Sequence, residues 1–224
     1  MTNSPLTAPV VFTFGPVPVT LPVVTSWAVM AAMTAAAALA ARRLRVERPG
    51  RLQTVMELLV QTQLRQLGET MQGDATPFLP FLGALFLYLA AANLSGLLPG
   101  VKAPTASIET AAALALIVLV ASQAFGVRAR GLGPYLKGFA KPSPLLLPLN
   151  LLSELTRAFS LSVRLFGNVM SGEFIIGIVL SLAGLFVPVP LMALEALLGL
   201  VQAYIFTVLA AVFIGGAVGT IEKG

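Results

Sequence analysis

Residues 174–201 read FIIGIVLSLAGLFVPVPLMALEALLGLV, and the sequence Val-Pro-Val-Pro at 187–190 interrupts them. Apart from Glu195, the chain carries no charge between residues 174 and 221. An α-helix needs about 20 apolar residues to cross a bilayer, and proline ends helices because it lacks a backbone N–H. The pattern therefore predicts an antiparallel hairpin of two membrane-embedded helices, 144–186 and 191–218.

The first of these two helices is too long to stand upright in a membrane. Its 43 residues would extend roughly 60 Å, twice the thickness of the hydrocarbon core. It must tilt strongly, kink, or lie partly along the interface. We expect both helices of the hairpin to be long and strongly tilted.

The composition of the whole chain agrees with a membrane protein. The 224 residues are 57% hydrophobic and 10% charged, and the mean hydropathy is +0.92, whereas soluble domains carry about 25% charged residues. These values exclude a soluble enzyme, a disordered chain and a nucleic-acid-binding module. Because the chain has no Cys and no His, disulfides, Cys/His metal sites and His-dependent catalysis are excluded too. No cofactor is expected.

Four more helices are expected before the hairpin. Three are apolar spans, 21–41, 77–98 and 109–127. The chain would therefore be an all-α membrane protein with five membrane-embedded helices in a single domain, 1–224. The fourth, 52–72, is amphipathic, and we place it along the membrane interface; packing on a soluble partner is the alternative. Its apolar positions are Leu52, Met56, Val60, Leu64, Leu67 and Met71.

The cations predict the orientation. Five arginines lie within residues 42–51, directly after the first span, and four cations lie within residues 128–141, whereas the loop 99–108 has only Lys102. Cytoplasmic loops of membrane proteins are enriched in Lys and Arg. We therefore expect the N-terminus outside and the C-terminus in the cytoplasm.

The helix predicted at 144–186 carries a polar stripe, because its polar residues recur at helical spacing. An arginine at membrane depth costs about 2.5–3.5 kcal/mol on insertion scales, and such residues usually mark an ion or substrate path. Glu154 and Arg157 can form a local, structural ion pair. Arg164 has no acid three or four positions away, which favours an acceptor on another chain. The stripe comprises Asn150, Ser153, Glu154, Arg157, Ser160, Arg164 and Asn168.

Two further carboxylates lie in the hairpin. Glu173 is half a helical turn out of phase with Arg164, and Glu195 shares a face with Gln202. One register of the hairpin would bring Glu173 to Glu195 and Arg164 to Gln202. Facing carboxylates in a low-dielectric site would share a proton or a cation, so the pair is a candidate proton relay or cation site; the alternative is that each lines a wet cavity.

Residues 160–173, SLSVRLFGNVMSGE, closely resemble the signature of subunit a of F-type ATP synthase. QAYIF at 202–206 matches the last-helix motif of that family, and NLSGLLP at 93–99 with Pro-Thr at 104–105 resembles its middle hairpin. The resemblance covers most of the chain from about residue 77 onward.

The resemblance implies a non-catalytic stator in the rotary Fo motor of a bacterial inner membrane. Two half-channels would lead H⁺ or Na⁺ to and from a rotating ring of c subunits, and the b subunits of the peripheral stalk would be further partners. The essential arginine of the family falls on Arg164, which would meet each ring carboxylate and bar direct leakage. Asn168, Glu173, Glu195 and Gln202 fall on channel and interface positions.

The sequence departs from the family in places. Members often have a His at one of the two positions occupied here by Glu173 and Glu195. The acidic residue that members often carry near the start of the arginine helix aligns with Asn150, and Ala158 stands where proline is frequent. A compact F-type ATPase that moves sodium is therefore an alternative interpretation. From the residues alone, a self-contained secondary cation transporter is the alternative function, although its internal repeats are missing, and a non-conducting scaffold would not need the intramembrane charges.

Overall fold

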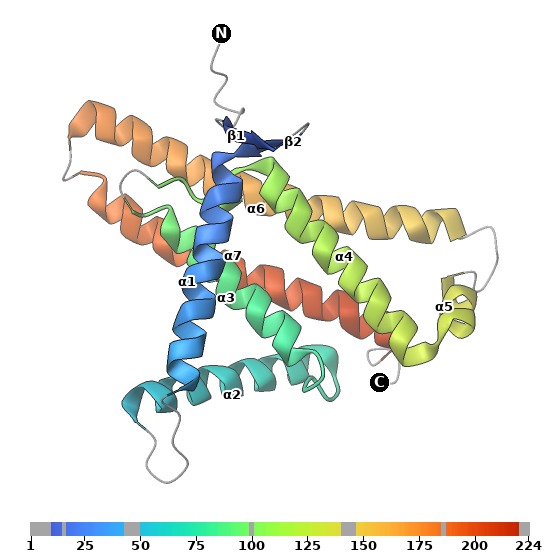
Figure 1. Ribbon diagram of the computed structural model, residues 1–224. Helices are drawn as coiled ribbons and strands as arrows, with labels where there is room; N and C mark the ends of the chain where they lie inside the picture. The colour runs from blue at the N-terminus through green and yellow to red at the C-terminus, as the bar shows by residue number, and fades with distance from the viewer. Residues whose placement is uncertain are drawn as a thin grey trace.

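The computed structural model describes residues 10–14, 17–42, 50–98, 101–139, 147–184 and 187–219 (Figure 1). These residues are almost entirely helical, which confirms the expected all-α class. The elements in chain order are the strands β1 (Val10–Phe14) and β2 (Val17–Thr20), the helices α1 (Leu21–Ala41), α2 (Arg51–Met71) and α3 (Leu79–Ser95), the 3₁₀ turn η1 (Pro104–Ala106), and the helices α4 (Ile108–Arg130), α5 (Leu132–Phe139), α6 (Leu147–Ala183) and α7 (Val189–Val218).

Four helices of the described residues, α1, α4, α6 and α7, are long and apolar enough to cross a membrane. The helix expected at 77–98 is shorter: α3 has 17 residues because Pro80 lies in its first turn and the chain turns at Gly96. The structure thus has four long apolar helices and a shorter fifth one, rather than five of full length.

The helices α6 and α7 form the expected hairpin. They have 37 and 30 residues, and the chain reverses between Gly184, whose φ is +79°, and Pro188, which precedes α7. Both helices lie steeply inclined to α1, and they diverge with distance from the turn that joins them (Figure 1). The steep inclination lets helices of this length fit beside shorter ones.

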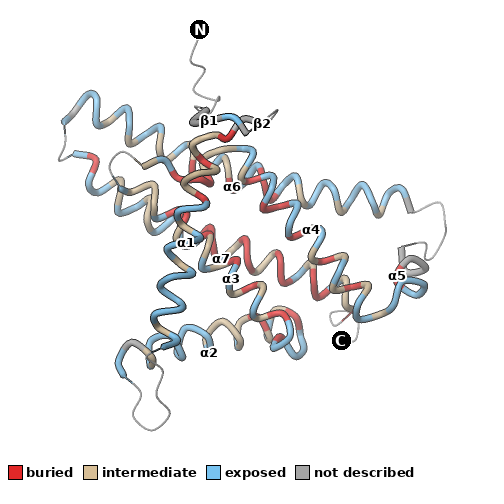
Figure 2. The backbone as a smooth tube through the Cα atoms, in the orientation of Figure 1, coloured by how far each residue is buried: buried red, intermediate tan, exposed pale blue. Residues whose placement is uncertain are grey.

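The core lies where α3, α4 and α7 cross (Figure 2). Leu82 and Leu89 of α3, Val118 of α4, Leu165 of α6 and Phe206 of α7 are all completely buried there. Most of α1 and much of α6 are exposed in the isolated chain (Figure 2). These exposed residues are largely apolar, and exposed apolar surface of this extent marks a region of contact with a membrane or another protein.

Two parts of the described chain go beyond the spans predicted from the sequence. The segment before α1 is extended and pairs into an antiparallel β-hairpin with Phe14 opposite Val17. The span predicted at 109–127 is longer than expected, because α4 continues to Arg130, and α5 follows after Gly131, whose φ is +80°. Residues 140–146 lie outside the described part of the chain.

The two halves of α2 differ in how far their apolar side chains are buried. Leu67 and Met71 near its end are buried in the core, whereas Val55, Leu58 and Leu59 near its start are exposed. The helix ends at Gln72 in the left-handed conformation, with φ +53°. Its exposed apolar half is free to lie against a membrane or a partner.

Candidate functional site

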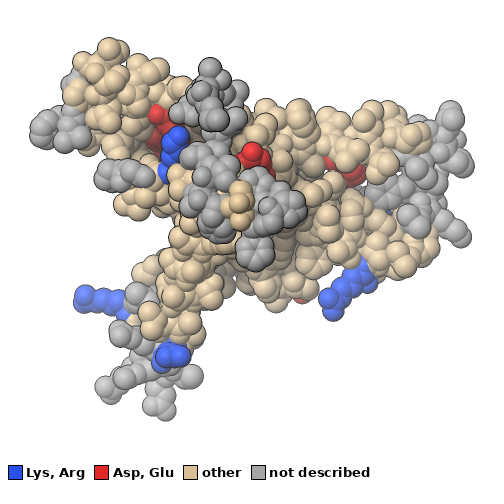
Figure 3. All heavy atoms as spheres, turned by 45° about the horizontal axis from the view of Figure 1, so that its top comes forward, with Lys and Arg blue, Asp and Glu red and all other residues tan. Residues whose placement is uncertain are grey.

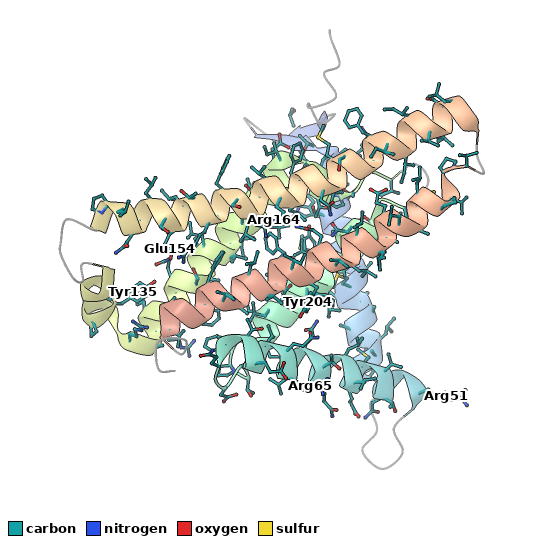
Figure 4. All side chains as sticks on the ribbon, turned by 180° about the vertical axis from the view of Figure 1, so that it is seen from behind. Arg51, Arg65, Tyr135, Glu154, Arg164 and Tyr204 are labelled. Carbon is teal, nitrogen blue, oxygen red and sulfur yellow. The ribbon has the colours of Figure 1, made fainter. Side chains whose placement is uncertain are left out.

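Arg164 lies near the middle of α6 (Figure 4). Its side chain is exposed, whereas Leu161 and Leu165 on the adjoining face of the helix are buried against the core. Ser160 and Gly167, a turn away on either side, are also exposed. Within the described residues the guanidinium has no hydrogen bond and no ion pair, which agrees with the absence of a local acid in the sequence.

The two glutamates of the hairpin are held differently. Glu173 is half-buried, and its Oε1 accepts a hydrogen bond of 2.8 Å from the backbone N–H of Ala103. Glu195, on α7, lies against Gly172 of α6: a Cβ at that glycine would be 2.5 Å from the Glu195 Oε1. The structure therefore brings Glu195 beside the residue that precedes Glu173.

A cavity of about 120 Å³ opens between α6 and α7 beside Glu195. Asn168 and Ser171 line it from α6, and Asn93 of α3 reaches it from the opposite side. The remaining lining is apolar apart from the backbone of Gly172 and Gly199. A carboxylate, two amides and a hydroxyl around a small cavity can hold water or a hydrated cation.

Gln202 of α7 is 5% exposed. Among the described residues its Nε2 has no hydrogen-bond partner, and no hydrogen bond joins it to Arg164. The second pair of the expected register is therefore not joined by a hydrogen bond among the described residues. A buried amide without a partner is costly, so Gln202 is a polar group with an unused donor close to the Arg164 helix.

Sequence reasoning from the residues missed a hydrogen-bond network beside the cavity. The side-chain amide of Asn93 donates to the carbonyl oxygen of Gly199 at 2.8 Å, and the hydroxyl of Thr105 donates to the Asn93 Oδ1 at 2.7 Å. These bonds tie α3 and η1 to α7. Asn93 and Thr105 lie in the two middle motifs of the family resemblance, but nothing in their spacing reveals that they meet at Gly199.

The other half of the polar stripe lies near the start of α6. Arg157 donates to Glu154 at 3.3 Å, so the expected local ion pair is present, and its guanidinium stacks over Phe213 of α7 at 5.7 Å. Ser153 is exposed and Asn150 is half-buried. Glu154 and Arg157 thus have partners within the chain, whereas Arg164 has none among the described residues.

The chain matches a known protein family over most of its length. A family model described as ATP synthase A chain matches residues 23–215. The chain is 59% identical to ATP synthase subunit a 2 of Bradyrhizobium sp. (strain BTAi1 / ATCC BAA-1182) over the full length of both proteins.

Two further relatives show the same relationship. ATP synthase subunit a 2 of Pelobacter propionicus is 44% identical over 96% of this chain and 94% of its own length. ATP synthase subunit a 1 of Chlorobaculum parvum is 46% identical over 91% of this chain and 90% of its own length. The chain is a multi-pass membrane protein that belongs to the ATP synthase subunit a family.

Proposed function

We propose that this chain is the ion-conducting stator of the Fo motor, a non-catalytic subunit that forms two half-channels against a rotating ring of c subunits. It would couple the movement of H⁺ or Na⁺ to ATP synthesis or hydrolysis. The observation that carries the proposal is the exposed guanidinium of Arg164, which has no hydrogen bond or ion pair within the described chain. An uncompensated arginine in an apolar helix indicates an acceptor on a partner.

Arginine suits this position because its charge does not titrate away at any physiological pH. A ring carboxylate that reaches Arg164 would be held in its ionised form and would release its ion. A fixed positive charge also repels cations that would cross directly from one half-channel to the other. Both effects need the exposed, unpaired arginine that the structure has.

One half-channel would run through the cavity beside Glu195. Its polar lining, with Asn168 and Asn93, and the neighbouring Glu173 give a cation a sequence of oxygen ligands. The unused amide donor of Gln202 would bind water further along α7. The other half-channel would start near Glu154 and Ser153, at the opposite end of α6.

The distribution of charge supports a placement in a bacterial inner membrane. Most of the surface visible in Figure 3 carries neither acidic nor basic side chains. The helices α2 and α5 lie toward one end of the structure and the β-hairpin toward the other (Figure 1). Because the arginines cluster around α2 and α5, we place that end in the cytoplasm and the hairpin outside. The b subunits and lipid would cover the exposed apolar helices.

The test is ATP-driven ion pumping by the assembled complex in vesicles, with and without sodium. Arg164→Ala should abolish pumping while ATP hydrolysis by the soluble part remains possible. Arg128→Ala, which changes an exposed arginine in the last turn of α4, is the control and should pump normally. A sodium requirement of the unchanged complex would identify the ion. Normal pumping by Arg164→Ala would refute the stator role, and ion transport by the isolated chain would favour a secondary transporter.

A further inference from the structure

The first part of α6 is weakly anchored by apolar packing. None of the residues from Pro148 to Ser160 is buried, whereas Leu161, Leu165 and Val169 further along the helix are. This is also the region in which α6 and α7 diverge (Figure 1). The start of α6 therefore lacks the buried apolar contacts that anchor its middle within the described chain.

Arg130, the last residue of α4, holds the end of α7. Its Nε donates to the carbonyl oxygen of Val218 at 3.0 Å, and its Nη2 donates to that of Gly216 at 3.4 Å. The last four carbonyl groups of a helix lack partners within the helix, and a cation there also interacts favourably with the helix dipole. Gly219, with φ +84°, leaves room for the guanidinium where a Cβ would overlap it.

Tyr135 of α5 inserts beside the same end of α7. It is 6% exposed, although Leu132, Gly133 and Pro134 before it are all exposed. Its hydroxyl donates to the Oε1 of Gln123 in α4 at 2.6 Å.

The Tyr135 ring packs on Gly126 of α4. A Cβ at Gly126 would be 2.5 Å from the ring and 3.1 Å from the Cβ of Ala217 in α7. A single aromatic side chain thus fills the corner between α4, α5 and α7.

Two charged groups influence Tyr135. Glu154 of α6 and Arg130 of α4 are close enough to influence it, and Figure 4 shows Tyr135 and Glu154 on neighbouring elements at the same end of the structure. Burial raises the pKa of the Tyr135 hydroxyl, the Glu154 carboxylate raises it further, and Arg130 acts in the opposite direction. The hydroxyl therefore remains protonated at neutral pH and keeps its donor for Gln123.

We propose that Arg130 and Tyr135 form a latch that sets the separation between the start of α6 and the end of α7, and that they are positioning residues for ion translocation. The latch holds α7 through its terminal carbonyls, and α5, which carries Tyr135, packs against α6. Arg157 of α6 in turn stacks over Phe213 of α7. This inference rests on the proposed stator function, because the load that the latch resists is the sideways force of a turning ring on α6.

The first test measures the separation directly. Because the natural chain has no cysteine, cysteines at Leu152 of α6 and Val212 of α7, both exposed, can carry spin labels in the assembled complex. Gly126→Ala should shift or broaden the distance distribution, because the new methyl group displaces the Tyr135 ring. Gly133→Ala is the matched control, since nothing lies within 4 Å of a Cβ there. Equal distributions for the two variants would refute the latch.

The second test measures its consequence. ATP-driven pumping should fall about tenfold in Gly126→Ala and Arg130→Leu, since small misplacements of a working group cost one to two orders of magnitude. Arg130→Lys should recover most of the rate because an ammonium can still donate to the α7 carbonyls. If Gly126→Ala fails to assemble, Tyr135→Phe, which removes only the bond to Gln123, should still broaden the distance distribution.

Arg164→Ala in the same vesicles separates the two hypotheses. Loss of pumping in Arg164→Ala, together with normal pumping and unchanged distances in Gly126→Ala and Arg130→Leu, would overturn the latch and leave the stator function standing. Normal pumping in Arg164→Ala would overturn the stator function itself, and the latch would fall with it as a positioning device.

Discussion

Glu195 of α7 lies directly against Gly172 of α6, so closely that a Cβ at residue 172 would be 2.5 Å from the Oε1 and 2.7 Å from the Cδ of the glutamate. Any larger residue at 172 must push the carboxylate away from the cavity that it lines with Asn168. The missing side chain of a single glycine thus fixes where a candidate channel carboxylate lies.

Gly172→Ala should therefore reduce ATP-driven pumping by about tenfold, an effect of the size expected for a misplaced functional group, while the complex still assembles. Gly177→Ala on the same helix, where nothing lies within 4 Å of a Cβ, should pump normally. Shortening the displaced side chain with Glu195→Asp should restore part of the rate in the Gly172→Ala background. Equal pumping by Gly172→Ala and Gly177→Ala would show that the position of Glu195 does not matter.

Asn93→Ala should destabilise the chain, because it leaves the Thr105 hydroxyl and the Gly199 carbonyl without the partners they have now. A buried unsatisfied group costs about 1–3 kcal/mol, and each kcal/mol corresponds to about 2–4 °C in Tm for a domain of this size. Thermal unfolding in detergent, followed by circular dichroism, would measure the shift.

The matched control for Asn93→Ala is Ser181→Ala. The Ser181 residue is exposed, and among the described residues its hydroxyl bonds only to the Ile178 carbonyl within its own helix. Its Tm should stay within a degree or so of the unchanged protein, as surface substitutions usually shift stability by less than about 0.5 kcal/mol. A Tm of Asn93→Ala no lower than that of this control would mean that the network adds nothing to stability.

The hairpin and its central residues could be predicted from the sequence because their signals are local. The proline pair at 188 and 190 and the long uncharged runs predict α6 and α7 within a few residues. The missing acid near Arg164 is visible in the sequence as well, since helical neighbours are three or four positions apart. The predicted register pairs Glu195 with Glu173, and in the structure Glu195 lies against Gly172, the residue before Glu173.

The rest depends on partners distant in the chain. The helix α5 has eight residues, too few for an apolar period to distinguish it from a loop. Asn93 meets Gly199 across 106 positions, and Arg130 meets Val218 across 88. Neither contact leaves a local pattern, because only the packing of α3 and α4 on α7 brings the groups together.

The Tyr135 hydroxyl should ionise above the usual range, because burial and the nearby Glu154 raise its pKa. Since the folded pKa lies above that of the unfolded chain, about 10, folding favours the protonated form. This contribution to stability is complete below the unfolded pKa and is lost as the pH rises through the folded one.

The chain has only three tyrosines, so the Tyr135 titration can be isolated. The tyrosinate absorbance of the unchanged protein minus that of Tyr135→Phe, recorded against pH, should rise above pH 10. Glu154→Gln should lower that midpoint, because it removes a negative charge that opposes ionisation. A difference curve centred at or below the ordinary tyrosine pKa would contradict the buried, acid-flanked position of Tyr135.

Gly219→Ala should destabilise the end of α7 for two reasons that do not apply to Gly216→Ala. Residue 219 has φ +84°, which costs a non-glycine residue about 1–2 kcal/mol, and its Cβ would overlap the Arg130 guanidinium. Nothing lies within 4 Å of a Cβ at Gly216, which is helical and exposed, so alanine there should be neutral or slightly stabilising. Hydrogen exchange at the last turn of α7 should accelerate in Gly219→Ala alone; equal exchange in both variants would show that Arg130 does not hold this helix end.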